Sequence, residues 1–517
     1  MTRRRFGGEV VMVLGNRLLC FCYNEAISDC EKSCIFAIKN MLFNSLGFAL
    51  FLPVVFLIYW LLRRSLRWQN FFVLAASYFF YGCWDWRFLV LIAFTSAISY
   101  ISGLMIARLP RGHARWMMWG NVVVNLLILG VFKYYDFFVQ SFADLFLGGC
   151  SDGLLLHLVL PVGISFYTFQ ALSYTIDVYR MTVQPTRDVV AFFAYVSFFP
   201  QLVAGPIERA SSLLPQFTAT RRFNYALAVD GLRQMLWGFF KKMVVADTCA
   251  LYVDRVFADY QQYTGSTLFL AAILFSIQIY GDFSGYSDIA IGCAKLFGIR
   301  LRRNFNVPYF SRDIAEFWRR WHISLTSWFR DYVYIPLGGS RVGRGRIVFN
   351  TFVIFLLSGL WHGANWTFVA WGAYHAFLFM PLILLGRNRR HLDTVAEGRL
   401  LPSWFEAVEM LITFILAAIG WVIFRSESIS DAISYLYAIF AQGLFAAPLS
   451  VAVPEYGILL IALPLLLVVE WLNRDKEHSF ARQPRRRWMR WVGYMLLIFI
   501  IVCYMQTSEM PFIYFQF

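Results

Sequence analysis

The sequence predicts an all-α, polytopic integral membrane protein, and three features indicate this fold. Of the 517 residues, 59% are hydrophobic and 15% are charged, whereas a soluble domain is about a quarter charged. Many apolar stretches approach the roughly 20 residues that cross a hydrocarbon core. The basic residues gather in short loops between these stretches. Together these features predict one helical membrane domain.

About eleven apolar stretches are long enough, or nearly so, to form transmembrane helices. We expect shorter re-entrant or amphipathic helices between them, because broken backbone at membrane depth is tolerated only inside protein. Segment 154–210 is one example, with Pro161, Pro200 and Pro206 inside apolar sequence. The expected spans are 46–62, 70–83, 87–107, 117–132, 189–204, 266–281, 347–360, 365–386, 407–424, 455–472 and 491–506.

The net charge of +15 indicates membrane topology rather than nucleic-acid binding. Arginines recur in loops at 63–67, 108–115, 341–346, 387–390 and 485–490. The positive-inside rule makes such loops cytoplasmic. The intervening turns then face outward, and we expect contact with membrane lipid but no nucleic-acid partner.

Residues 1–40 differ from the rest of the chain. They carry charged residues ahead of Met41, where the first strong apolar span begins, and they have no signal-peptide cleavage pattern. We interpret 1–40 as an N-terminal extension or a mis-assigned start, and 41–517 as the membrane domain. Four of the nine cysteines lie in this extension, at 20, 22, 30 and 34, without a paired C-x-x-C, so we expect no metal site.

Residues 312–333 have the pattern of an amphipathic helix. Apolar positions recur every three or four residues, at Ile314, Trp318, Trp321, Leu325, Trp328 and Tyr332. His322 falls at the margin of this apolar face. Arg319, Arg320 and Arg330 fall on the other side, toward water, headgroups or a phosphate-bearing ligand. His322 is thus a candidate for chemistry, or a hydrogen-bonded structural histidine in an interfacial helix.

The segment W-H-G at 361–363 offers a second candidate histidine, His362. The apolar run 347–360 covers only about 21 Å at 1.5 Å per residue, less than the roughly 30 Å core. We therefore expect a turn buried below the outer surface, where Gly359 and Gly363 permit close approach of a substrate. An imidazole there could take a proton from a hydroxyl that attacks an acyl thioester, an effect worth about 10²–10⁴ in rate. A structural histidine bonded to a backbone carbonyl is the alternative.

Further polar residues lie beside apolar runs. Asp282 and Asp288, within G-D-F-S-G-Y-S-D, are candidates to line a cavity or to cap a helix. His375 lies in the middle of a span, where we expect it to pack between two helices. The sequence lacks the nucleotide phosphate loop, the H-E-x-x-H zinc motif and the G-x-S-x-G elbow.

Several segments carry a resemblance to a known family. They are M-L-F-N-S at 41–45, F-P-Q-L-V-A-G-P-I at 199–207, G-Y-S-D-I-A-I-G at 285–292, N-F-N-V-P-Y at 304–309, F-W-R-R-W-H-I-S-L-T-S-W-F-R-D-Y-V-Y-I-P-L-G-G at 317–339 and L-W-H-G-A-N-W-T-F at 360–368. From about Met41 to its end, the chain resembles the membrane-bound O-acyltransferase (MBOAT) family. Within it, the chain is similar to the alginate O-acetyltransferase branch of bacterial polysaccharide acetylation proteins.

The resemblance implies the MBOAT fold and a reaction across the bacterial cytoplasmic (inner) membrane. An acyl group would pass from a cytoplasmic thioester, acetyl-CoA or an acyl carrier, through a narrow tunnel to an outer acceptor, with no cofactor held by the protein. The family's invariant histidine falls on His362 and its second histidine on His322. The branch often works with a separate periplasmic acetyltransferase that acetylates an exported polysaccharide.

The leading hypothesis is therefore O-acetylation of an exported, alginate-like polysaccharide, with His362 as base and His322 assisting or orienting. Trp318, Trp321, Trp361 and Trp366 would wall the tunnel. Arg319, Arg320 and Arg330 would contact donor phosphates, although contact with lipid headgroups explains them equally well. The alternatives are a transporter or flippase that moves an acyl or lipid-linked group without catalysis, and an acyltransferase that acts on lipid or protein.

Overall fold

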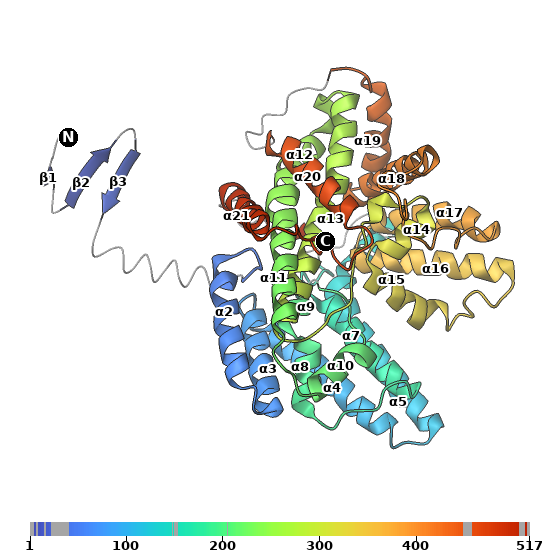
Figure 1. The fold of residues 1–517 in the computed structure, drawn as a ribbon. Helices are drawn as coiled ribbons and strands as arrows, with labels where there is room; N and C mark the ends of the chain where they lie inside the picture. The colour runs from blue at the N-terminus through green and yellow to red at the C-terminus, as the bar shows by residue number, and fades with distance from the viewer. Residues whose placement is uncertain are drawn as a thin grey trace.

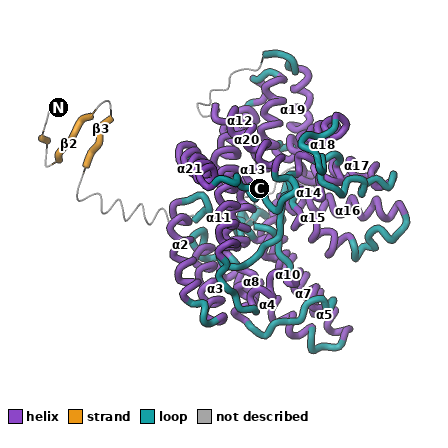
Figure 2. Tube along the Cα trace, viewed as in Figure 1, coloured by secondary structure: helices purple, strands orange, loops and turns teal. Residues whose placement is uncertain are grey.

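The computed structural model describes residues 5–6, 9–14, 17–21, 41–146, 148, 153–203, 205–447, 457–505 and 512–513. The described part of the membrane domain is helical, as predicted (Figures 1 and 2). Most of the extension 1–40, with the side chains of its four cysteines, lies outside the described residues. Its described backbone forms a small antiparallel sheet, which the sequence did not predict. The strand order is β1 (Arg5–Phe6), β2 (Glu9–Leu14) and β3 (Arg17–Phe21).

Apolar helical hairpins build the first part of the membrane domain. Their starts are capped where the sequence offers a hydroxyl: Ser45 and Ser65 each accept a hydrogen bond from a backbone N–H of the first turn. Four expected spans fall on these helices. The elements are α2 (Leu46–Leu61), α3 (Leu66–Gly82), α4 (Phe88–Ile106), α5 (Arg111–Lys133) and α6 (Tyr135–Phe146).

Short, broken helices follow, and the expected span 189–204 is wrong. The chain leaves the helix at Phe198, and Pro200 lies at the start of the next one. The break is buried inside the protein, where Gly163 has a left-handed φ of +73° and a side chain would clash with the carbonyl oxygen of Leu202. The elements are α7 (Ile164–Tyr179), α8 (Val189–Ser197), α9 (Phe199–Leu202) and α10 (Ala210–Thr218).

The centre of the molecule is the 32-residue helix α13 (Gly265–Leu296), which is largely buried. The expected span 266–281 covers only its first part. The helix continues through polar residues because Lys242 and Lys241 pair with Asp282 and Asp288, each at 2.6 Å. The neighbouring elements are α11 (Tyr225–Phe239), the π-helix η1 (Phe240–Ala246), α12 (Asp247–Ala258) and η2 (Tyr260–Gln262).

The predicted single helix over 312–333 is wrong, because the chain breaks at His322. That residue has a left-handed φ of +42°. The break is held by the preceding loop: the backbone N–H of Ile323 donates to the carbonyl oxygen of Asn304, and that of Asn306 donates to the carbonyl oxygen of Arg320. The elements are η3 (Pro308–Phe310), α14 (Ile314–Arg320), α15 (Ile323–Phe329) and the π-helix η4 (Arg330–Tyr334).

Helix α16 is longer than the apolar run 347–360. The prediction that this helix is too short to cross the hydrocarbon core is therefore wrong. It has 19 residues because it begins at Arg344 within the basic loop and ends at His362. A side chain at Gly359 would clash with the carbonyl oxygen of Phe368, so this glycine serves packing against α17 rather than approach of a substrate. The last elements are α16 (Arg344–His362), α17 (Trp366–Leu384), α18 (Trp404–Arg425), α19 (Ile429–Ala441), α20 (Leu459–Leu472) and α21 (Arg487–Tyr504).

Seven of the described helices are long and apolar enough to cross a membrane. They are α4, α5, α13, α16, α17, α18 and α21, and α2, α19 and α20 are shorter apolar helices. In the described part of the chain, each expected span except 189–204 overlaps a single long helix. The described chain therefore has the architecture of a multi-pass membrane protein.

Candidate active site

The two candidate histidines meet inside the helical body. The ring centroids of His322 and His362 are 6.5 Å apart, and the residues are 1% and 4% exposed. His322 lies in the turn between α14 and α15, whereas His362 is the last residue of α16. The indole of Trp361 lies 5.5 Å from the first ring and 5.0 Å from the second. The fold thus joins the two motifs in one site.

The ring of His322 is held by a polar network. Its Nδ1 lies 3.0 Å from Oδ1 of Asn304, whose Nδ2 donates to the hydroxyl of Ser287 at 3.1 Å. The same Oδ1 accepts from the Ser324 hydroxyl at 2.9 Å. Because this oxygen can only accept, the network assigns the ring proton to Nδ1. Nε2 has no hydrogen-bond partner among the described residues, so it is left as a proton acceptor.

His362 is held through its backbone, by the end of α5. Nζ of Lys133 donates to the carbonyl oxygens of Trp361, at 2.7 Å, and His362, at 3.1 Å. The neighbouring Tyr134 hydroxyl donates to the carbonyl oxygen of Leu360 at 2.7 Å. The last carbonyls of a helix lack helical partners and attract positive charge. Two residues from a distant helix therefore fix the position of the α16 terminus.

Aromatic rings surround the imidazole of His362. Trp371 approaches it edge-on at a centroid distance of 5.1 Å, and Phe424 at 5.3 Å. Trp371 also packs on Trp421 at 5.7 Å. Such a cluster shields the imidazole from water, which favours proton transfer to a bound reactant over exchange with solvent.

Two pockets adjoin the site: His362 lines the first, and Asn304, which bonds His322, lines the second. The first is lined by residues that include Lys133, Pro161, Gly163, Phe166, Trp361 and His362. The second is lined by residues that include Lys241, Ser287, Asp288, Arg303, Asn304 and His478. If the basic loops are cytoplasmic, as the sequence predicts, the first pocket lies toward the outer face and the second toward the cytoplasm.

The structure does not gather the four predicted tryptophans into one wall. Trp361 lies beside both histidines, and Trp318 and Trp321 are buried nearby, where the Trp318 Nε1 donates to Nδ1 of His375 at 3.3 Å. Trp366 is 51% exposed and donates to the hydroxyl of Ser141 at 3.2 Å. Trp366 therefore lies outside the buried aromatic cluster around the histidines.

The three predicted arginines have different surroundings. Arg320 is buried and pairs with Glu316 at 2.7 Å, so the expectation that it faces water is wrong. Arg319 donates to the carbonyl oxygens of Asn388, at 2.7 Å, and His391, at 2.6 Å. Arg330 is exposed, as expected, and pairs with Asp331. Arg319 and Arg320 thus hold the fold together around the site.

The two predicted aspartates also separate. Asp288 lines the second pocket, where it pairs with Lys241. Asp282 pairs with Lys242 and accepts from the backbone N–H of Ile513 at 2.7 Å. Asp282 lines neither of the two pockets described above. It is a buried residue that helps to pack α13.

Three residues of the site have no role in the sequence analysis: Asn304, Lys133 and His478. Asn304 lies in the N-F-N-V-P-Y motif, and Lys133 is a single cation at the end of an apolar run. His478 lines the second pocket, and its Nε2 lies 3.0 Å from Oδ1 of Asp230. His478 and Lys295 hold the pKa of the Asp230 carboxyl well below its usual range.

Comparison with known proteins gives the family of this chain. The model of the MBOAT, membrane-bound O-acyltransferase family matches residues 186–422. The chain is 42% identical to the probable alginate O-acetylase AlgI of Pseudomonas aeruginosa, over 78% of this chain and 75% of that protein. It is 32% identical to the peptidoglycan O-acetyltransferase of Helicobacter pylori, over 92% of this chain and 98% of that protein. It is 27% identical to the teichoic acid D-alanyltransferase of Bacillus subtilis, over 52% of this chain and 70% of that protein.

The helical fold and these relatives define an enzyme of the membrane, a multi-pass O-acyltransferase. The chain belongs to the MBOAT family, as its motifs predicted, and it resembles the alginate O-acetylases within it.

Proposed function

We propose that this enzyme passes an acetyl group across the membrane for the O-acetylation of an exported cell-surface polysaccharide, with alginate or an alginate-like polymer as the final acceptor. The observation that carries the proposal is the buried pair of histidines, of which His362 lines a pocket. The identity to alginate O-acetylases supports the acceptor class. The donor is a cytoplasmic thioester, acetyl-CoA or an acetylated carrier, and the enzyme lies in the bacterial inner membrane.

In the proposed reaction, His362 takes the proton of the acceptor hydroxyl. The oxygen then attacks the thioester carbonyl carbon, an ester bond forms and the carbon–sulfur bond breaks. The departing thiolate receives the proton from the imidazolium, which restores the neutral histidine. His322, whose ring contacts Trp361 and whose Nε2 has no partner among the described residues, assists by orienting the reacting groups.

A separate periplasmic acetyltransferase belongs to this proposal. The acceptor hydroxyl on the outer side would then belong to that partner, which passes the acetyl group to the polysaccharide. The first pocket suits such an acceptor, because Lys133 and His362 line it together.

Peptidoglycan is a second candidate acceptor, favoured by one observation. The match to the peptidoglycan O-acetyltransferase covers 92% of this chain and 98% of that protein, more of both than the match to the alginate O-acetylase. The chemistry at the histidines would be the same, since only the polymer to which the partner passes the acetyl group would differ.

The test is complementation of a host that lacks the gene, with ester-linked acetate measured in purified exopolysaccharide by NMR and in muropeptides by mass spectrometry. The wild-type chain is expected to restore acetate in the exopolysaccharide, and His362→Ala to abolish it at equal membrane protein level. His375→Gln is the matched control, because His375 is also fully buried, and we expect at most a few-fold loss. Acetate restored only in muropeptides would transfer the proposal to peptidoglycan, and full acetylation by His362→Ala would contradict a catalytic role.

A further inference from the structure

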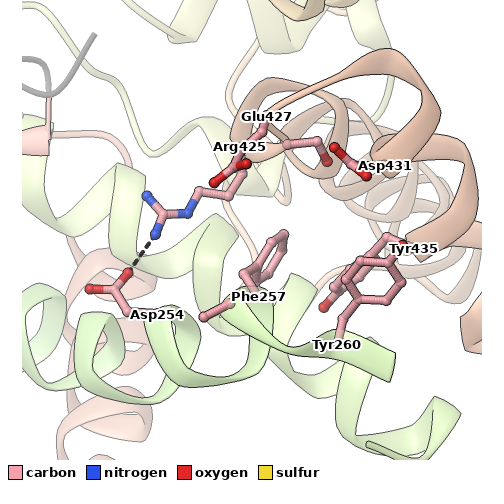
Figure 3. Close-up of a pocket in the computed structure, with 9 residues that line it drawn as sticks. Asp254, Phe257, Tyr260, Arg425, Glu427, Asp431 and Tyr435 are labelled. Atoms are coloured by element: carbon pink, nitrogen blue, oxygen red, sulfur yellow. Dashed lines mark hydrogen bonds and ion pairs between the residues drawn. The ribbon is translucent and has the colours of Figure 1, made fainter. Parts of the chain in front are cut away.

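A third pocket, of about 440 Å³, lies where α12 and α18 end and α19 begins (Figure 3). The proposed chemistry does not use it. Helix α18 runs from the basic loop at 387–399 to Arg425, so the positive-inside rule puts this pocket on the outer face, the side on which α16 ends at His362.

The pocket has an aromatic floor and an acidic rim. Tyr435 stacks on Phe257 at a centroid distance of 4.5 Å and contacts Tyr260 at 5.5 Å. The rim carries one cation, Arg425, whose Nη2 is 2.6 Å from a carboxylate oxygen of Asp254 (Figure 3). That ion pair neutralises both groups.

Two further carboxylates, those of Glu427 and Asp431, also line the pocket. They leave it with excess negative charge, although the chain as a whole carries +15. Carboxylates and the faces of aromatic rings both attract a guanidinium or ammonium group. A polymer of uronates would be repelled by the same carboxylates, so the lining favours a cationic ligand.

The rim is bonded to the turn that carries His362. Nδ2 of Asn365, three residues after this histidine, donates to the carbonyl oxygen of Glu427 at 3.0 Å. Phe424, which directly precedes Arg425, packs on the imidazole at 5.3 Å. A ligand in the pocket would therefore touch the segment that positions the active site.

We propose that this pocket docks an arginine or lysine side chain of the protein that receives the acetyl group on the outer face. The proposal rests on the proposed function for the existence of that partner. Docking there would hold the partner beside the W-H-G-A-N turn, which Asn365 bonds to the pocket rim. The partner's acceptor hydroxyl would remain free to reach the first pocket.

The test uses the full-length protein in phosphatidylcholine nanodiscs and a fluorescent tetra-arginine peptide, with binding measured by anisotropy at fixed low salt. Glu427 suits substitution because it is exposed and its bond to Asn365 uses the backbone. We expect the peptide Kd to rise several-fold in Glu427→Gln and at least tenfold in Glu427→Lys. Asp144→Asn, which removes another exposed carboxylate, is the matched control and should leave the Kd unchanged.

An unchanged peptide Kd in Glu427→Lys would overturn the proposal. So would displacement of the peptide by a neutral or uronate oligosaccharide that itself loses binding in Glu427→Lys, because the pocket would then be a glycan site. His362→Ala should bind the peptide as the wild type does. Failure of docking is therefore separable from failure of the acetylation chemistry, which this assay does not involve.

Discussion

The two histidines of the site are fixed in different ways. His322 lies in a left-handed turn, and its ring is held by a side-chain network through Asn304. His362 ends a long helix, and its carbonyl oxygen, with those before it, is held by Lys133 and Tyr134 of another helix. One histidine has its ring atoms set by hydrogen bonds, whereas the other has its backbone set and its ring enclosed by aromatic side chains.

This difference is compatible with the proposed division of roles, His362 as the base and His322 as the orienting group. A ring whose Nδ1 proton is fixed presents Nε2 in one direction, which suits a group that orients a reactant. A helix end held in place beside a pocket suits the group that meets an incoming hydroxyl. The roles can be separated, because each histidine has its own supporting residues.

Among the substitutions of His322 and of the residues that hold the two histidines, loss of the His322 ring should have the largest effect on the acetylation rate. We expect His322→Gln to lower the initial rate of labelled-acetate incorporation into polysaccharide by about 10²-fold, because general acid–base and orienting groups contribute about that much. Protein level in the membrane should be unchanged. A rate within twofold of the wild type would remove His322 from the reaction.

Asn304→Ala should give the next largest effect, a loss of about tenfold. The substitution removes the acceptor for Nδ1–H, so the ring can turn and change tautomer, and one such hydrogen bond is worth about 1 kcal/mol or more. Ser287→Ala is the control, since Ser287 bonds only the other end of the amide, and it should cost less. An Asn304→Ala rate equal to that of Ser287→Ala would show that the tautomer is not set in this way.

Lys133→Met should slow acetylation by several-fold to about tenfold, because the α16 terminus loses two hydrogen bonds. Lys133→Arg, which can donate to both carbonyl oxygens, should recover most of the rate. If Lys133 served only packing, the larger arginine would lower the rate more than methionine does. That result would refute the role of Lys133 in positioning the α16 terminus.

Tyr134→Phe should have the smallest effect, about two- to fivefold in rate, because it removes one neutral hydrogen bond worth about 1 kcal/mol. The same assay measures it, with the thermal unfolding midpoint of the detergent-solubilised protein as a second readout. A loss larger than that of Lys133→Met would reverse the order in which these two residues support the helix end.

The sequence predicted the helical fold and both histidines because those signals are local. Apolar runs are contiguous, and the W-H-G turn lies within a few residues. The break at His322 could not be predicted, since the helical spacing of Trp318, Trp321 and Leu325 continues across it and the bonds that impose it come from Asn304 and Asn306.

Contacts between residues that are far apart in the sequence could not be predicted, because no local pattern indicates them. Lys133 bonds a carbonyl 228 residues away, and nothing in its own apolar run indicates that contact. The burial of Arg320 follows from its pairing with Glu316, which competes with solvent only once the surrounding helices have packed.

The central claim is that His322 and His362 act as one catalytic unit. A double-mutant cycle tests it most directly, with rates of labelled-acetate incorporation measured for His322→Gln, His362→Gln and the double variant at equal membrane protein levels. Residues that act as a unit are strongly non-additive, so the double variant should be within about threefold of His362→Gln alone. A loss equal to the product of the two single losses would mean that the histidines act independently, and would contradict the claim.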